Sequence, residues 1–253
     1  MALVRACLVA LGLASAAGLL LLVRPHRASG AVPPRSQAQA VERGRALFDR
    51  FCASCHGSGG LGTSQGPPLL GVGAAAVDFM LSTGRMPLAV ATQQPTVQRQ
   101  TARFSRAEID ALVAYVTSLY PGGPPVPRVH PERGDLVRGN RLFTSNCAPC
   151  HSAAAVGDAV GGGAVAPSLR QSTATQIAEA VRVGPGVMPR FGPEALDQHD
   201  LDSLVRYLLA LRTLPNPGGL GLGFVGPVAE GFVAWIAGLG LIVLAIRWIG
   251  TTT

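Results

Sequence analysis

The hydrophobic pattern divides the chain into two apolar ends and a more polar middle. The first apolar run, Ala6 to Val23, is uncharged, rich in Leu and Ala, and ends at Arg24. Its 18 residues are just enough to span a bilayer and are long for the apolar core of a removed signal, but Ala28-Ser29-Gly30 would pass as a small-residue cleavage site. Residues 1–30 are therefore predicted to be a signal peptide or a membrane anchor, and the pattern leaves both open.

The second apolar run is the stronger membrane candidate. Gly231 to Ile246 is uninterrupted and apolar, and Trp235 and Trp248 lie near its two ends. Aromatic residues are enriched at membrane interfaces, and no other segment looks able to cover such a helix on all sides as a buried core helix requires. We predict a transmembrane helix within 219–249. Arg247 indicates a cytoplasmic C-terminus, so the middle of the chain is expected on the extracytoplasmic side.

The middle of the chain shows helical periodicity separated by Gly- and Pro-rich loops. A first helix is predicted from about Val41 to Phe51, and another from about Arg106 to Tyr120. Ser105, followed three residues later by Glu108, has the spacing of a capping box. Since no alternating strand pattern of useful length is present, the expected fold class is all-α.

An internal duplication organises this middle region. The pattern Arg-Gly-x-x-Leu-Phe, three residues and then Cys-x-x-Cys-His begins at Arg43 and again at Arg138, 95 residues later. Similar Pro-x-Leu, Met-Pro and final helical segments follow in both copies. We expect two small domains, and the Pro-rich segment between them is a semi-extended linker. The predicted bounds are 38–121 for the first domain, 122–132 for the linker and 133–215 for the second domain.

Composition and charge exclude some classes of protein. Of 253 residues, 48% are hydrophobic and 14% are charged, which excludes a disordered chain. The net charge is +7, but every basic residue is an arginine, and the arginines are scattered. A Lys-rich nucleic-acid tail is absent, so we expect no nucleic-acid partner.

Four of the five cysteines form the two Cys-x-x-Cys-His motifs, which are the attachment signature of c-type haem. On a helical turn, two thiols at this spacing share a face and can reach the two vinyl groups of a porphyrin, while the adjacent histidine points at the iron. The motifs predict two covalently bound haem c groups. The attaching thiols are those of Cys52, Cys55, Cys147 and Cys150.

Three other interpretations of the motifs agree less well with the sequence. A thioredoxin-like redox pair needs a βαβ context, and the pattern here is helical. A structural zinc site could combine both pairs, but their separation is unlike a zinc ribbon. Disulfides are permitted outside the cytoplasm, although they leave the two histidines unexplained.

The iron ligands follow from the few methionines. Met86 and Met188 both precede proline at corresponding places in the two copies, whereas Met80 lies in an apolar, helix-like stretch. Bis-histidine ligation would have to use His26, His130 or His199, none of which has a counterpart in the other copy. We expect His/Met ligation, which raises the reduction potential and suits electron transfer. The expected axial ligands are His56, Met86, His151 and Met188.

These motifs resemble tandem class I cytochrome c domains. The resemblance implies that the carbonyls of Pro67 and Pro167 accept hydrogen bonds from the haem-ligating histidines. With the segment Ser82–Pro87 and the tail that enters the final helix at Gly226–Gly231, nearly the whole chain is similar to a narrower family. That family is the dihaem cytochrome c subunit (QcrC type) of the actinobacterial menaquinol–cytochrome c reductase.

The narrower resemblance implies a function and partners. Electrons would pass from the cytochrome b and Rieske iron–sulfur subunits through the first and then the second haem to a haem–copper terminal oxidase. The chain would be multi-pass in the cell membrane if its N-terminal helix is retained and single-pass otherwise. The alternatives are a dihaem subunit of a terminal oxidase, and a free-standing dehydrogenase with one open haem.

Overall fold

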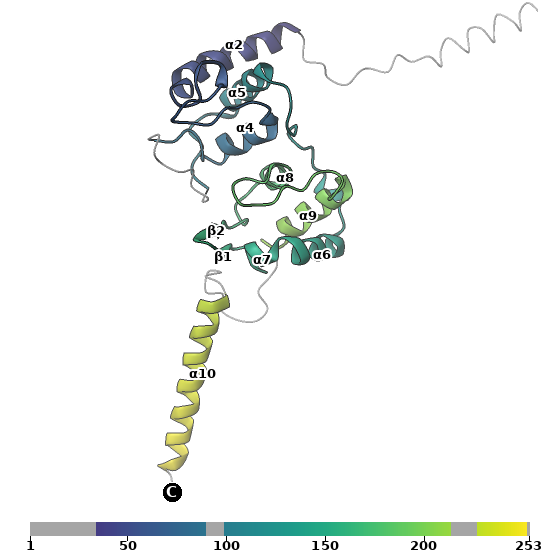
Figure 1. The fold of residues 1–253 in the computed structure, drawn as a ribbon. Coiled ribbons are helices and arrows are strands. Elements are labelled where there is room, and N and C mark those ends of the chain that lie inside the picture. Colours follow the sequence, from purple (N-terminus) through teal and green to yellow (C-terminus); the bar gives the residue numbers. More distant parts are fainter. Residues whose placement is uncertain (1–33, 90–98, 214–226, 252–253) are drawn as a thin grey trace, which may run out of the picture. The chain divides into compact units, whose positions relative to one another are not determined.

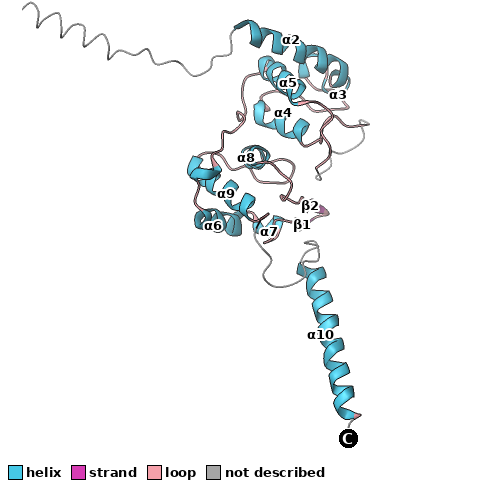
Figure 2. Cartoon of the chain, turned by 180° about the vertical axis from the view of Figure 1, so that it is seen from behind, coloured by secondary structure: helices cyan, strands magenta, loops and turns pink. Residues whose placement is uncertain are grey.

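The structure is a computed structural model that describes residues 34–89, 99–213 and 227–251 (Figure 1). The described part is mostly helical, which confirms the expected fold class in its main feature. The predicted signal or anchor at 1–30 lies outside the described residues. Helices dominate both copies of the duplication, as the colouring by secondary structure makes plain in Figure 2.

The first copy contains four α-helices and one 3-10 turn within the described residues. They are α2 (Pro34–Phe51), α3 (Ala53–His56), η1 (Ser58–Gly60), α4 (Gly73–Ser82) and α5 (Arg106–Leu119). The first helix therefore begins seven residues before the predicted start at Val41, and it ends at Phe51 as predicted.

The predicted capping box at α5 is present. The Ser105 side chain accepts from the backbone N–H of Glu108, and the Glu108 carboxylate accepts from the backbone N–H of Ser105. Two backbone donors at the helix start are thereby satisfied, which fixes the first turn of α5. The second copy has a capping box of the same kind, formed by Thr173 and Gln176 at the start of α8 (Ala174–Val183).

The second copy repeats the order of helices with one addition. Its other elements are η2 (Pro131–Arg133), α6 (Leu136–Asn146), α7 (Ala148–His151), β1 (Asp158–Gly161), β2 (Ala164–Ala166) and α9 (Gln198–Ala210). The short antiparallel hairpin β1–β2 is an addition to the expected all-α class that the sequence pattern did not indicate. Each strand is too short for alternation to be visible, and glycines at Gly161–Gly163 make the turn by adopting positive φ.

A glycine in each copy lets two helices approach closely. A Cβ added at Gly44 would lie 1.9 Å from the carbonyl oxygen of Ala111, and one added at Gly139 would lie 2.1 Å from that of Ser203. These glycines belong to the repeated Arg-Gly-x-x-Leu-Phe pattern. The first helix of each copy can therefore touch the backbone of the last helix only because glycine has no side chain.

Each copy has its own hydrophobic core, and the repeated phenylalanine lies in it. Phe48 is 1% exposed with its ring centroid 5.3 Å from that of Tyr115, and Phe143 is 1% exposed and 5.7 Å from Tyr207. The first core gathers residues of α2, α4 and α5, and the second gathers residues of α6, α8 and α9. The repeated sequence pattern is thus a repeated packing pattern.

The chain ends in a long apolar helix, α10 (Pro227–Gly250). Within it, Glu230–Gly250 spans 21 residues with a mean hydropathy of 2.2, and none of the hydrophobic window is buried against protein. At about 1.5 Å per residue this segment is about 32 Å long, close to the thickness of the hydrocarbon core of a bilayer. The exposure of its apolar side chains contradicts a buried core helix and fits the predicted transmembrane helix.

Candidate functional site

The first Cys-x-x-Cys-His motif forms a single helical turn at the end of α2. The backbone N–H of Cys52 donates to the Phe48 carbonyl at 2.8 Å, and the N–H of His56 donates to the Cys52 carbonyl at 2.9 Å. Cys55 follows the same turn, with its N–H 3.1 Å from the Cys52 oxygen. This geometry brings the two thiols and the imidazole to one side of the turn.

The second motif repeats the first bond for bond. The N–H groups of Cys150 and His151 donate to the Cys147 carbonyl at 3.1 and 2.8 Å, and Cys147 itself donates to Phe143 at 2.8 Å. All four cysteines are free thiols. Two equivalent sites are therefore built by the same local backbone.

Each histidine is oriented by the carbonyl of a proline. His56 Nδ1 lies 2.8 Å from the Pro67 oxygen, and His151 Nδ1 lies 2.9 Å from the Pro167 oxygen. A carbonyl oxygen only accepts, so Nδ1 carries the proton and donates, which leaves Nε2 with a lone pair. Metal-binding histidines are commonly oriented in this way.

Burial favours the neutral form of the second histidine, His151. His151 is buried, and this burial lowers its pKa below the ordinary value, although the bond to Pro167 partly offsets the effect. A neutral imidazole is the form that binds a metal ion. The site in the second copy is thus electrostatically suited to a metal ligand.

The leading cysteine of each motif has a raised pKa. Burial first, and then the charge of the neighbouring Cys55, raise the pKa of Cys52 to about 11. Cys147 has a pKa of about 11 for the same two reasons, with Cys150 as its neighbour. Redox-active thiols of the thioredoxin type have lowered pKa values, so these surroundings do not favour a redox pair.

The methionines predicted as ligands pack against the same cores as the motifs. Met86 and Cys52 both contact the first core, and Met188 and Cys147 both contact the second. The two cysteine pairs therefore belong to different cores, which a shared zinc site does not allow. In the described ranges, no three or more His, Cys, Asp or Glu side chains gather as a metal-ion group. Met80 lies within α4, as its apolar surroundings predicted.

Sequence reasoning missed the residues that hold the methionine segments. Arg85, next to Met86, is buried with its guanidinium 4.8 Å from the centroid of the Phe79 ring, and burial lowers its pKa. In the second copy Arg182 donates to the carbonyls of Phe191 and Leu196 at 3.0 and 2.7 Å. Sequence spacing identifies neither the Phe79 ring that faces Arg85 nor the carbonyls that accept from Arg182. For Arg182, the position of an arginine within an apolar pattern was the only available signal.

Comparison with known families agrees with the duplicated geometry. Residues 41–120 match the family described as Cytochrome c, and residues 134–208 match the family described as Cytochrome C oxidase, cbb3-type, subunit III. Each match covers one Cys-x-x-Cys-His motif with its proline and methionine. Two cytochrome c domains carry two covalently bound haem c groups.

Similar proteins extend the match over nearly the whole chain. A "Cytochrome bc1 complex cytochrome c subunit" of Mycobacterium bovis is 38% identical, covering 96% of this chain and 89% of that protein. The protein of the same name in Corynebacterium diphtheriae is 33% identical, covering 96% and 92%. The "Cbb3-type cytochrome c oxidase subunit CcoP" of Azospirillum is 29% identical over 67% of this chain and 61% of that protein. The chain belongs to the family of cytochrome c subunits of the cytochrome bc1 complex.

Proposed function

We propose that this chain is the membrane-anchored dihaem electron carrier of a menaquinol–cytochrome c reductase. It would carry electrons from the cytochrome b and Rieske iron–sulfur subunits to a haem–copper terminal oxidase. The observation that carries the proposal is the pair of Cys-x-x-Cys-His turns, each with its histidine oriented by a proline carbonyl. Family membership supports assignment to an electron-transferring oxidoreductase complex, and menaquinol as the reductant is the finer step.

The proposed haem-binding residues have the chemistry that the group requires. Four free thiols suit the thioether bonds, and the Nε2 atoms of His56 and His151 suit the iron. A bound c-type haem supplies an iron that gains and loses one electron. We assign Met86 and Met188 as the second protein ligands, because each packs against the same core as the leading cysteine of its motif. A methionine ligand would raise the reduction potential of the bound haem.

A buried donor in the second copy also fits a haem. Arg212 donates to the carbonyls of Leu169 at 3.1 Å and of Ser172, in the segment that follows Pro167. Its Nε is buried with no hydrogen-bond partner among the described residues. A buried donor of this kind requires an acceptor, and the carboxylates of a haem are acceptors.

The proposed domain bounds are 38–121 and 133–215, joined by a linker at 122–132 and followed by a membrane segment within 219–249. The family matches at 41–120 and 134–208 fall inside the two domains. Arg247 near the end of α10 supports a cytoplasmic C-terminus and extracytoplasmic haem domains. If the segment 1–30 is retained as a helix, the chain crosses the membrane twice.

The alternative is a dihaem subunit of a terminal oxidase. It is favoured by the match of residues 134–208 to the cbb3-type subunit III and by the similarity to the Azospirillum protein. Purification of the native complex in mild detergent separates the two functions. Recovery of cytochrome b and Rieske subunits supports the reductase, whereas recovery of oxidase catalytic subunits without cytochrome b overturns it.

A further inference from the structure

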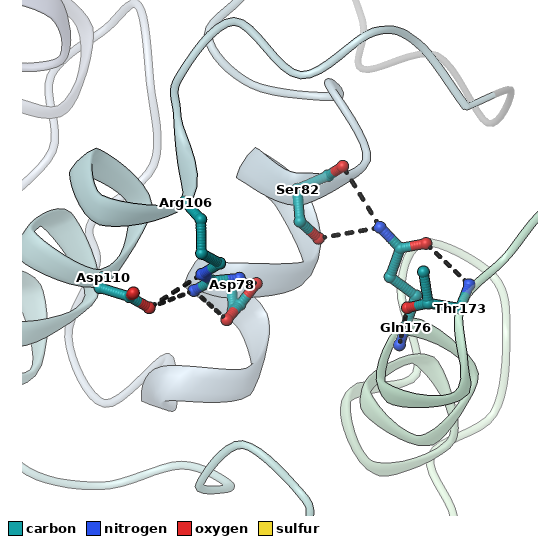
Figure 3. A network of polar contacts seen from close by, with 6 residues as sticks. All are labelled: Asp78, Ser82, Arg106, Asp110, Thr173 and Gln176. Atoms are coloured by element: carbon teal, nitrogen blue, oxygen red, sulfur yellow. Dashed lines mark hydrogen bonds and ion pairs between the residues drawn. The ribbon is translucent and has the colours of Figure 1, made fainter.

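The two copies meet through one helix from each. Residues of both copies fall in a compact unit that begins at Ala38, in which α4 of the first copy packs against α8 of the second. Gln176 of α8 donates through Nε2 to the carbonyl oxygen and to the hydroxyl of Ser82, both at 3.2 Å (Figure 3). The same glutamine completes the capping box of α8, so both the oxygen and the nitrogen of its side-chain amide are hydrogen-bonded.

The duplication places an acidic residue at the same position of these two helices. Asp78 is the sixth residue of α4, and Glu179 is the sixth residue of α8; each helix has ten residues. Both side chains are buried, Asp78 at 5% exposed and Glu179 at 0%. Two buried carboxyl groups on helices that pack together need either cations or protons.

The first copy supplies a cation and the second does not. Arg106 at the start of α5 donates to both carboxylate oxygens of Asp78, at 2.9 and 2.6 Å, and also contacts Asp110 (Figure 3). The corresponding first residue of α9 is Gln198, whose amide donates to Asp202 at 2.9 Å. An acidic residue therefore occupies the sixth position of both helices, whereas the arginine at the start of α5 is replaced by glutamine at the start of α9.

Glu179 is left without a partner. Neither of its carboxyl oxygens has a hydrogen-bond partner in the part of the chain that the structure describes. The charged groups that face it are Asp78 from α4 and Arg106 from α5. Burial first, and then the charge of Asp78, raise the pKa of Glu179 to about 8, and Arg106 opposes the rise. A buried, unpaired carboxylate is costly, so the neutral acid is the form that suits this position.

We propose that Glu179 is held as a neutral acid between the two copies and that the strength of the α4–α8 contact depends on its proton. The contact weakens when Glu179 loses its proton to water, because the carboxylate then faces Asp78 without a cation of its own. Arg106 remains with Asp78 and Asp110 in both forms. The protonation of Glu179 therefore sets the stability of the interface between the two haem domains.

The direction of the pH effect follows from proton linkage. When the contact opens, Glu179 meets water and its pKa returns to the ordinary carboxyl value, below that of the closed form. Below this ordinary value both forms hold the proton, and the contact is at its strongest. Between it and about 8, only the closed form holds the proton, so opening becomes about tenfold more favourable per pH unit. Above about 8 both forms are ionised, and the dependence levels off.

Hydrogen exchange of the haem-loaded full chain in detergent measures this opening. Amide exchange in α4 and α8 is compared between the native chain and Glu179→Gln at each pH, so the intrinsic pH dependence of exchange cancels. The ratio of the opening constants should rise about tenfold per pH unit and level off near pH 8. Glu42→Gln, which changes an exposed glutamate of α2, should leave the native pH dependence intact. A ratio that does not change with pH overturns the proposal.

Infrared spectroscopy tests the proton itself. The band of a protonated carboxyl group should be present at pH 7, should disappear on titration through about pH 8, and should be absent in Glu179→Gln. Asp78→Asn offers a second variant if the first fails to fold; since it removes the charge that raises the pKa of Glu179, the midpoint should move to lower pH. If Glu179 is already ionised at pH 6, or if Asp78→Asn leaves the midpoint of the Glu179 titration unchanged, this pair does not control the α4–α8 contact.

Discussion

Individual side chains set the chemistry of the two haem sites. The proline carbonyls that face His56 and His151 each accept from Nδ1, so that Nε2 carries the lone pair in both copies. The surroundings of the two methionines proposed as iron ligands are less symmetric. The residue before Met86 is the buried Arg85, whereas the residue before Met188 is Val187, which is 76% exposed. The two proposed iron sites therefore share their histidine geometry and differ in the segment that carries the methionine.

The assignment of methionine can be tested by substitution. Met86→Leu should abolish the charge-transfer band of one His/Met-ligated ferric haem and lower its reduction potential, because methionine favours the reduced iron. Axial ligands set potentials over a range of about 0.8 V, and we expect a decrease on the order of 0.1 V. Spectra and redox titration of the purified chain measure both effects. Met80→Leu, in the neighbouring helix, is the control, and equal behaviour of the two variants would refute the assignment.

Secondary-structure elements determine how each site is held. In both copies the helix before the motif packs directly on the backbone of the last helix at a glycine, and the following phenylalanine enters the core. The turn that carries the cysteines continues from that helix. A shift in the position at which these two helices cross would therefore displace the thiols and the histidine together.

Loss of the close approach should destabilise the second copy. A methyl group at Gly139 would overlap the carbonyl of Ser203, so Gly139→Ala should lower the free energy of unfolding by about 1–3 kcal/mol. Thermal denaturation of the haem-loaded chain measures the change. Asn140→Ala alters an exposed residue in the next position of α6 and should have a much smaller effect. Equal stability of Gly139→Ala and the native chain would show that the helices separate without cost.

The apolar helix α10 permits a test of membrane insertion. Leu241→Arg places a charge near the middle of the span and should disfavour insertion by about 3 kcal/mol. A reporter fused after Thr253 measures the fraction of chains whose C-terminus reaches the cytoplasm, which should fall. Ile249→Arg, near the helix end, should have little effect because arginine there can reach the interface. If both variants behave like the native chain, α10 does not cross the membrane in this way.

At the scale of the whole molecule, the described residues form two cytochrome c domains with separate cores and the apolar helix α10. In each domain the leading cysteine of the motif and the methionine pack against that domain's own core, so we expect each domain to hold its haem without residues of the other. The domains meet at α4 and α8, where corresponding positions of the two helices place two acidic residues in one buried interface. Placing both carriers on one chain replaces diffusion between them by a high effective concentration.

Separate sites predict additive loss of haem. The double substitution Cys147→Ala/Cys150→Ala should reduce the haem content from two groups to one per chain and leave the spectrum of the first site intact. Haem content per chain, determined by the pyridine haemochrome assay, checks this expectation. Cys7→Ala, outside both motifs, should still yield two groups. Loss of both haems from the double variant would show that the domains do not mature independently.

The local and repeated features of the chain could be predicted from the order of its residues. The two motifs, the capping box at Ser105 and the helices at Val41–Phe51 and Arg106–Tyr120 depend on contacts between residues close in the chain, which spacing reveals. The apolar final helix is likewise evident from its length and composition. The structure lengthened the first helix to Pro34 and ended the second at Leu119, without changing either element.

Contacts between residues far apart in the chain became known only from the folded structure. The approach of Gly44 to Ala111, the carbonyl partners of Arg182 and the hairpin β1–β2 could not be derived from spacing, since each needs a partner that only the fold supplies. Glu179 is the clearest case. In the sequence it is one glutamate in an amphipathic helix, and only the packing of α8 on α4 removes it from water opposite an acid whose arginine is already engaged.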